Sequence, residues 1–332
     1  MRNLILGALC AGTVALGGAA AMAQTTIRVT LQLPKTHSLG QNWLDFKALV
    51  EEKSGGDMEV QLFDSAQLFK DKEVPEAVGS GAVEAGSAFL GRFTGAVPAV
   101  DVVAIPFIFD DEAHLRASVA AGSAMRDTLD SAILRETNNK VLWWQAFGRN
   151  IYLSNGDPIR LPADMKDKKV RTYGKIQGWT IEALGGAPTL MSGSKQFLAY
   201  QQGAVDVGMT GASAVKSRKL YEVMNTMTLS YDSAIEFLAV MNNDFFEGLT
   251  PEQQKIIMDS AAEVEAKLRD SIYKQEVAAV EEVTPKMTVV VLTDAERAEW
   301  VAATSGIVDR FIAETGETGA EAVAAVRAAA TK

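Results

Sequence analysis

The chain has 332 residues, a length that suits two α/β lobes of ordinary size. Its hydrophobic fraction of 48% and charged fraction of 22% are typical of a soluble globular protein. The formal net charge of −10 argues against nucleic acid or an acidic membrane surface as a partner, because both would repel the chain.

The first 23 residues have the pattern of an export signal. Arg2 precedes an apolar run over 4–16, and Ala21-Met22-Ala23 has the A-x-A form of a signal-peptidase site. The apolar run is too short to span a membrane. We therefore expect cleavage near Ala23 and a periplasmic mature protein. The single cysteine, Cys10, lies in this segment, so the mature chain would contain no disulfide and no cysteine metal site.

The first half of the mature chain alternates strand and helix patterns. Period-two alternation and short apolar runs predict strands at 26–31, 58–63, 83–90, 140–147 and 151–154. Helical spacing of apolar residues predicts helices at 42–53, 74–80 and 113–137. Pro106 lies inside the apolar run 102–109 and favours a packed loop there over a central strand.

The second half repeats this alternation. Strands are predicted at 168–171, 187–191, 205–209, 226–229, 237–241 and 286–292, and we expect the strand at 237–241 to return to the first lobe. Shorter helices are predicted at 176–184, 192–202, 211–218, 294–313 and 319–330. Together these patterns indicate two strand-helix-strand lobes with more than one crossing between them.

One long helix follows Thr250. Thr250, Pro251 and Gln253 form a capping box with proline in the first turn, and no helix breaker occurs before Pro285. A helix of this length would reach roughly 50 Å at about 1.5 Å per residue, which exceeds one small lobe. We therefore expect a strut that lies across both lobes, with two helices and an unmarked bend as the alternative.

Arg171 stands at the carboxyl end of the short strand at 168–171, directly before Thr172 and Tyr173. Ligands of open α/β sheets bind beyond the carboxyl ends of the strands. An arginine there stays charged and can hold a carboxylate through two parallel hydrogen bonds. The alternative is a solvated basic face, which suits the neighbouring lysines.

The sequence offers little that supports catalysis. His37 and His114 are the only histidines, and neither has the spacing of a zinc site. We expect His114 at the surface near a helix start and His37 in a loop, where it could contact a ligand. There is no G-x-S-x-G elbow and no Walker sequence. The sequence therefore predicts neither an enzyme nor a bound cofactor or metal.

Several motifs, in order, resemble one family over nearly the whole mature chain. They are Ser54-Gly55-Gly56, SAQLFKDKE at 65–73, IPFIF at 105–109, the run from Pro158-Ile159 to Arg171, QGAVD at 202–206, and 246–252 with Phe246 in place of a tryptophan. In this combination the chain resembles the dicarboxylate-type solute-binding proteins of tripartite ATP-independent periplasmic (TRAP) transporters.

The resemblance implies an α/β, two-lobed periplasmic-binding-protein fold with a long helix spanning both lobes. The lobes would close over one small organic acid by hinge bending and deliver it to the small and large TRAP membrane subunits. The implied division is a signal peptide at 1–23, lobe 1 at 24–148 plus about 237–275, and lobe 2 at 149–236 plus about 276–332. A monomer is expected, with a dimer as the alternative.

The resemblance also implies site residues. Arg171 would bind the ligand carboxylate, and Arg149 falls where many members keep a second basic residue. Further positions that line the cleft in relatives are Gln32, Ser87, Ala88, Phe89, Trp144, Tyr173, Thr210, Tyr231 and Asp232.

The chain also departs from the family pattern. Thr210 stands where an asparagine is common, and Ser192-Gly193 follows a strand after which an aromatic residue is frequent. Asp232 places an acid near the hinge, which would suit a ligand that carries an amine or hydroxyl. These departures argue against a plain C4-dicarboxylate or sialic acid. The alternative functions are an ABC-type or sensor-linked binding protein and a periplasmic enzyme.

Overall fold

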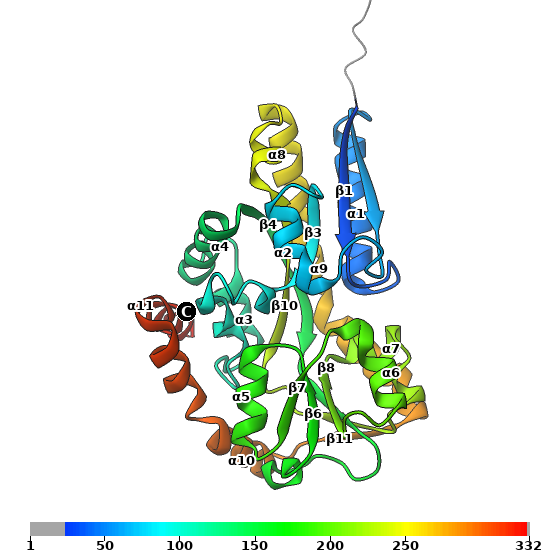
Figure 1. Cartoon of the computed structure of the whole chain (residues 1–332), viewed down its shortest axis with the longest axis vertical. Coiled ribbons are helices and arrows are strands. Elements are labelled where there is room, and N and C mark those ends of the chain that lie inside the picture. The colour runs from blue at the N-terminus through cyan, green and yellow to red at the C-terminus, as the bar shows by residue number, and fades with distance from the viewer. Residues whose placement is uncertain (1–23, 331–332) are drawn as a thin grey trace, which may run out of the picture.

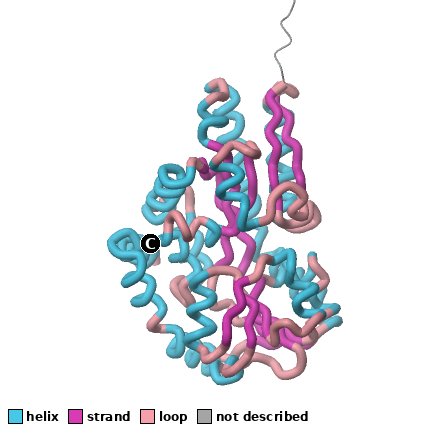
Figure 2. The backbone as a smooth tube through the Cα atoms, in the orientation of Figure 1, coloured by secondary structure: helices cyan, strands magenta, loops and turns pink. Residues whose placement is uncertain are grey.

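The computed structural model describes residues 24–330, so the predicted export segment and its cleavage point lie outside the described residues. Two α/β lobes, each built on its own sheet, lie one above the other with a long helix passing both (Figures 1 and 2). The fold is therefore the two-lobed α/β architecture that the sequence predicts.

The sheet of the first lobe has the strand order β2-β1-β3-β10-β4. Its strands are β1 (Thr25–Leu31), β2 (Met58–Phe63), β3 (Ala85–Phe89), β4 (Asn139–Arg149) and β10 (Ala234–Asn242). β1 pairs in parallel with β2 and β3, whereas β10 is antiparallel to both β3 and β4. The return of the strand predicted at 237–241 to the first lobe is thus confirmed.

The sheet of the second lobe has the order β11-β9-β5-β8-β6-β7. Its strands are β5 (Ile151–Ser154), β6 (Lys169–Thr172), β7 (Ala187–Leu190), β8 (Val207–Thr210), β9 (Thr226–Leu229) and β11 (Thr288–Val291). β6, which carries Arg171, lies between β7 and β8 and is parallel to both. The carboxyl ends of β6 and β8 therefore meet at one edge of the sheet.

Helices cover both sheets. The α-helices are α1 (Ser38–Lys53), α2 (Val74–Gly79), α3 (Glu112–Val119), α4 (Ala124–Thr137), α5 (Lys175–Ala183), α6 (Gln196–Gln201), α7 (Ala212–Ser217), α8 (Asn243–Glu247), α9 (Pro251–Val283), α10 (Asp294–Thr304) and α11 (Ile307–Ala329). Short 3₁₀ turns are η1 (Asp71–Glu73), η2 (Leu90–Arg92), η3 (Pro98–Ala104), η4 (Pro162–Met165), η5 (Gly193–Lys195), η6 (Leu220–Glu222) and η7 (Thr284–Lys286). No helix within 24–330 has both the length and the apolar character needed to cross a membrane.

The long helix α9 is the predicted strut. Thr250 accepts a hydrogen bond from the Gln253 amide N–H, and the Gln253 side chain accepts one from the Thr250 N–H, so the capping box forms. The 33-residue helix contacts α1 and β4 near the first sheet and α7 near the second. It therefore joins the two lobes as one continuous element.

Two helices that were predicted as continuous are each interrupted in the structure, so these predictions are wrong. The helix expected at 113–137 is interrupted, because Gly122 adopts a φ of 78° and Ser123 caps a new helix by accepting from the Arg126 N–H. The helix expected at 294–313 ends at Thr304, and α11 begins only at Ile307. The capping box at its start, Thr293 with Glu296, does form.

His114 is not at the surface as the sequence suggested. It is 6% exposed, and its Nε2 lies 2.7 Å from the Val326 carbonyl oxygen of α11. The prediction was wrong because the C-terminal helix folds back onto α3 and covers that face, a contact between segments 212 residues apart.

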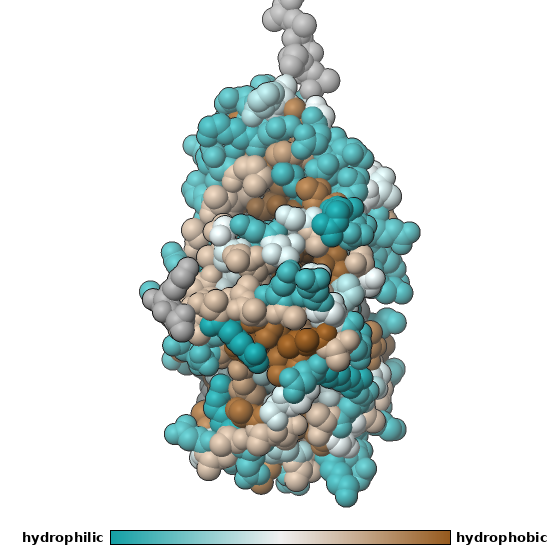
Figure 3. Space-filling view, turned by 90° about the vertical axis from the view of Figure 1, so that its left-hand side faces the viewer, coloured by the Kyte–Doolittle hydropathy of each residue, from teal (hydrophilic) through white to brown (hydrophobic). Residues whose placement is uncertain are grey.

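Apolar cores lie on both faces of each sheet. One cluster joins the lobes, since it combines Phe89 and Phe237 of the first sheet with Tyr152 and Val207 of the second. On the face shown in Figure 3, hydrophilic residues cover the upper end of the molecule, hydrophobic residues gather across its middle, and the lower end is mixed. The chain passes from the first sheet to the second where β4 ends and β5 begins. The C-terminal helix α11 packs against η3, α3 and α4. The residue limits of the two lobes remain a prediction.

Candidate functional site

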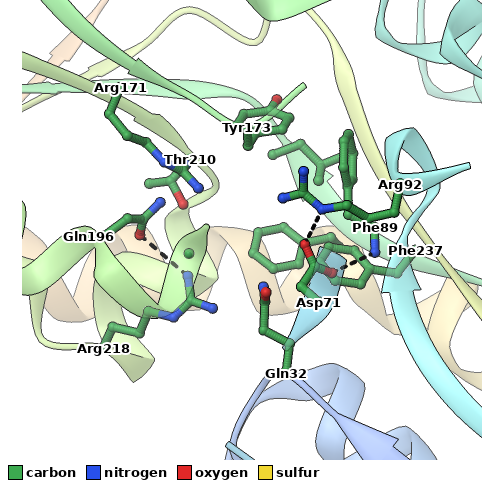
Figure 4. A pocket seen from close by; sticks show the side chains of 13 residues that line it. Gln32, Asp71, Phe89, Arg92, Arg171, Tyr173, Gln196, Thr210, Arg218 and Phe237 are labelled. Carbon is green, nitrogen blue, oxygen red and sulfur yellow. Dashed lines mark hydrogen bonds and ion pairs between the residues drawn. The ribbon is translucent and has the colours of Figure 1, made fainter. Parts of the chain in front are cut away.

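A cavity with about 350 Å³ of empty space lies between the lobes. It sits at the carboxyl ends of parallel strands from both sheets, where α/β folds bind ligands: β1 and β3 on one side, β6 and β8 on the other. The lining residues are Gln32, Asp71, Phe89, Arg92, Phe147, Arg171, Tyr173, Gly193, Gln196, Thr210, Arg218, Ile235 and Phe237 (Figure 4).

Arg171 points into this cavity from β6, the strand next to the edge of the second sheet (Figure 4). Its Nε and Nη2 donate to the Met191 carbonyl at 3.1 and 2.8 Å, and Nη1 donates to the Met209 carbonyl. No ion pair joins it to a carboxylate of the described chain, and it is only 3% exposed. Burial accordingly lowers the pKa of Arg171. Its orientation is fixed, but its charge is not neutralised.

Arg218 supplies a second guanidinium on the same side of the cavity. The Gln196 amide lies between the two arginines (Figure 4). In one orientation its oxygen accepts from Arg218 Nη1 at 3.3 Å; turned over, it accepts from Arg171 at 2.5 and 3.2 Å. One amide oxygen cannot serve both groups well. Burial lowers the pKa of Arg218 to about 10, and the charge of Arg171 adds to this shift.

The wall formed by the first lobe is electrically balanced. The buried Asp71 carboxylate forms an ion pair with Arg92 and accepts a hydrogen bond from the Phe89 amide N–H at 3.1 Å. Beside it, the Phe89 ring contacts Tyr173 and Phe237, with centroid distances of 5.2 and 5.9 Å. This side therefore presents a neutral ion pair and an apolar aromatic surface.

Two hydrogen bonds cross between the lobes beside the cavity. Ser192 Oγ donates to Gln32 Oε1 at 3.2 Å. His37 caps α1, since its Nδ1 accepts from the Leu39 N–H, so its Nε2 carries the proton and donates to Ser213 Oγ at 3.2 Å. Burial lowers the pKa of His37 to about 3, so this imidazole is neutral near pH 7.

The sequence profile of the bacterial extracellular solute-binding proteins, family 7, matches residues 30–315. The chain belongs to this family. The family is defined by solute binding rather than by catalysis.

Relatives of this solute-binding protein extend over its whole length. The C4-dicarboxylate-binding periplasmic protein DctP of Rhodobacter capsulatus is 28% identical and covers 99% of both chains. A TRAP periplasmic solute-binding protein of Sulfurospirillum deleyianum with bound succinate is 25% identical, with a TM-score of 0.85 over 93% of this chain and 100% of that one. One of Roseobacter denitrificans with bound β-D-glucuronate is 24% identical, with a TM-score of 0.85 over 91% and 99%, and supports the fold.

The structure places the sequence-predicted site residues in three groups. Those that line the interlobe cavity are Gln32, Phe89, Arg171, Tyr173 and Thr210. Three others do not line it: Ser87 donates to Gln145 at 2.6 Å, Ala88 packs in the first-lobe core, and Trp144 donates to Asp130 at 2.8 Å.

The remaining three lie around the chain crossings on another side of the hinge. Arg149 forms an ion pair with Glu276 of α9 at 2.7 Å, and its guanidinium stacks on Tyr231 with 3.5 Å to the ring centroid. Asp232 accepts hydrogen bonds from three side chains: Asn150 at 2.8 Å, Tyr152 at 3.0 Å and Ser230 at 2.9 Å. Arg149, Tyr231 and Asp232 line a separate hollow rather than the interlobe cavity.

Sequence reasoning missed eight of the lining residues: Asp71, Arg92, Phe147, Gly193, Gln196, Arg218, Ile235 and Phe237. Asp71 stood inside a motif that was recognised, but a charge in a polar run resembles a solvated surface. Arg218 stood at the predicted end of a helix, where a basic residue is ordinary. Only the fold brings it beside Gln196, 22 residues away.

Proposed function

We propose that this protein is the periplasmic receptor of a TRAP transporter and that it binds a small organic acid between its lobes. The observation that carries the proposal is the pair Arg171 and Arg218. Both guanidinium groups line the interlobe cavity without an ion-pair partner among residues 24–330; Arg171 is buried and Arg218 is partly exposed. A buried, unneutralised charge is costly, and an anionic ligand would remove that cost.

Arg171 is the primary carboxylate-binding group. Its carbonyl contacts fix the plane of the guanidinium, so little freedom is lost when a carboxylate binds. Exclusion of water strengthens this charge pair. The carboxylate ligands bound in the structural relatives, succinate and β-D-glucuronate, are consistent with this chemistry.

Closure of the lobes accompanies binding. The cavity walls come from both lobes, and the contacts Gln32–Ser192 and His37–Ser213 exist only when the lobes are together. The ligand adds attraction across the gap and so shifts the equilibrium toward the closed state. No bond of the ligand is made or broken, and the protein is a carrier rather than an enzyme.

The export and delivery steps complete the proposal. The segment 1–23 directs export and is removed near Ala23. The mature protein works as a monomer and hands its ligand to the small and large membrane subunits. Micromolar affinity, about −8 kcal/mol, would suit this task.

A thermal-shift and calorimetric screen of the mature protein against hydroxy, keto, amino, aromatic and dicarboxylic acids tests the proposal. A ligand that binds only the folded state raises the melting temperature. We expect at least one acid to do so. Arg171→Ala should weaken binding of that acid by about 3–5 kcal/mol, because the ligand charge would be left buried and unpaired.

Lys195→Ala is the matched control. Lys195 lies close in sequence to the cavity-lining Gly193 and Gln196 but is exposed, so its loss removes one positive charge without changing the cavity. Affinity that stays at the wild-type level in Arg171→Ala would refute the assignment. If no acid shifts the melting temperature, denatured protein is analysed for a released acid; finding none would refute a carboxylate receptor.

A further inference from the structure

Helix α5 of the second lobe packs against the first lobe away from the ligand cavity. Its Ile176 and Trp179 side chains belong to the same apolar cluster as Val100 and Val103 of η3, and α5 contacts η3 directly. Trp179 is only 6% exposed and does not line the cavity. The second lobe therefore places an indole ring in the core of the first lobe.

The C-terminal helix α11 completes this contact from the first lobe. The preceding helix α10 belongs to the second lobe, since Trp300 Nε1 donates to the Arg160 carbonyl at 2.7 Å. Helix α11 then leaves that lobe, running from beside α5 to α3 and α4, where Val326 meets His114 (Figure 1). The family resemblance assigns 276–332 to the second lobe, but these contacts favour α11 moving with the first.

Opposite charges join α5 to α11. Lys175 of α5 pairs with Glu314 of α11 at 2.7 Å, and Glu182 of α5 pairs with Arg310 of α11 at 3.0 Å. Both cations also lie over the Trp179 ring, with Lys175 Nζ at 4.9 Å and Arg310 Cζ at 4.1 Å from its centroid. Each exposed ion pair is weak alone, but the pairs surround a buried ring and fix the register of the two helices.

We infer that these five residues form an interlobe latch, which engages when the lobes close and stabilises the closed state from outside the ligand cavity. This inference rests on the closure step of the proposed function. None of the five lines the cavity, yet α5 follows directly after the cavity-lining Tyr173 and the strand that carries Arg171. Movement of the second lobe around a ligand therefore carries α5 toward α11. In the open state the indole ring is exposed and the ion pairs are broken.

The interlobe latch gives the receptor an adjustable bias toward closure. A contact that exists in only one of two states shifts the equilibrium toward that state. Ligand affinity can thereby change without any change in the residues that touch the ligand. Because the ion pairs face solvent, salt screens them, and closure becomes less favourable as the ionic strength rises.

Cross-linking of the full mature protein without ligand tests the interlobe latch. The mature chain from residue 24 onward contains no cysteine, because Cys10 is the only one in the sequence. Cysteines replace Gln32 and Ser192, whose side chains meet across the lobes at 3.2 Å. A short bifunctional thiol reagent at low concentration then joins them in closed molecules, so the rate of cross-linking measures the closed fraction. Circular dichroism melts establish that each variant is folded.

Loss of latch contacts should slow the cross-linking. We expect the rate to fall about 1.5-fold to fivefold in Glu182→Gln and in Glu314→Gln, the usual strength of an exposed ion pair. Trp179→Leu should lower it about threefold to thirtyfold, because the cation contacts of the ring are lost. Lys175→Glu should also lower the rate, and adding Glu314→Lys to it should restore part of the loss.

The matched control is an ion pair of the same kind within one lobe. Lys53 of α1 pairs with Glu263 of α9 at 3.1 Å, both beside the first sheet, so Lys53→Gln should leave the rate unchanged. Acrylamide quenching gives a second readout, in which subtraction of Trp179→Phe isolates the fluorescence of Trp179. This signal should be quenched before cross-linking and protected after it.

The outcomes separate failure of the latch from failure of the proposed function. If all latch variants cross-link at the wild-type rate, or if Trp179 is equally protected before and after cross-linking, the interlobe latch is overturned while the carboxylate receptor stands, since no ligand takes part. If the two cysteines never cross-link even with the latch intact, the closure step and the latch are overturned together. Whether the cavity binds an acid is decided by the acid screen alone.

Discussion

Arg171 and Arg149 are two arginines of similar sequence context that occupy opposite electrostatic situations. Each lies on a β-strand near the junction of the lobes, and the sequence suggests a ligand role for both. Arg149 is paired with Glu276 and stacked between Tyr231 and Tyr273. Arg171 is buried, and its fixed acceptors within residues 24–330 are carbonyl groups. The supply of acceptors around the guanidinium, rather than its position on a strand, therefore distinguishes Arg149 from the arginine that we propose binds the ligand.

The difference has a thermodynamic consequence. A paired charge contributes to the stability of the empty protein, and its removal leaves a partner uncompensated. An unpaired buried charge costs stability in the empty protein and repays it only when a ligand arrives. The two arginines should therefore respond to substitution in opposite ways.

Arg149→Ala provides the largest expected effect on stability. Glu276 is only 4% exposed at its side chain, and loss of its partner should lower the free energy of unfolding by about 3–5 kcal/mol. Arg171→Ala should leave the stability of the empty protein equal to or above that of the wild type. Urea denaturation of both variants, in the absence of ligand, measures the contrast. Equal losses of stability in the two would show that Arg171 is also a structural residue.

Asp232→Asn extends the comparison to a buried acid of the paired kind. Its carboxylate accepts from Asn150, Tyr152 and Ser230, and an amide would turn a donor toward one of these donors. Burial raises the pKa of Asp232 above the usual aspartate value, against the lowering effect of its hydrogen bonds. We expect a loss of about 1–3 kcal/mol in the free energy of unfolding.

The same urea titration measures the effect of Asp232→Asn. Tyr152→Phe, which removes one of the three donors, should cost less. An Asp232→Asn midpoint identical to that of the wild type would contradict a structural role and return this residue to the list of ligand contacts.

The contrast also shows what the sequence could and could not predict. Local patterns predicted the elements well: the capping box at Thr250 marked the start of α9, and alternation gave β2 and β9 with their observed limits. Local patterns failed where a distant segment decides. Nothing near His114 indicates that Val326 will cover it.

The site was predictable only in part, for the same reason. Arg171 could be proposed because a strand end is a local feature and the family resemblance supported it. Arg218 could not, because its significance depends on Gly193 and Gln196, which another part of the chain contributes. Arg149 could not be excluded from the predicted cavity residues either, because its ion-pair partner Glu276 lies 127 residues away in the sequence.

The smallest expected effect on stability concerns His37, which lies at the junction of the two lobes. Burial lowers its pKa from 6.5 to about 3, with the nearby charge of Arg218 adding to the shift. The unfolded chain therefore binds a proton below about pH 6.5 that the folded protein does not accept. The stability contributed by neutral His37 is present above pH 6.5 and is lost as the pH falls toward 3.

Between pH 7 and pH 5.5 this linkage should cost the wild type about 1 kcal/mol more than His37→Asn. Asparagine is a matched replacement, because it also caps a helix start but does not titrate. Asp101 and Asp130, whose pKa values burial raises to about 7 and about 6, act in the opposite direction, but they are present in both proteins and cancel in the difference. Urea denaturation of both proteins at the two pH values measures this difference in the free energy of unfolding. Parallel pH dependences in wild type and variant would mean that His37 is solvated, and that the lobes are then apart in the ligand-free protein.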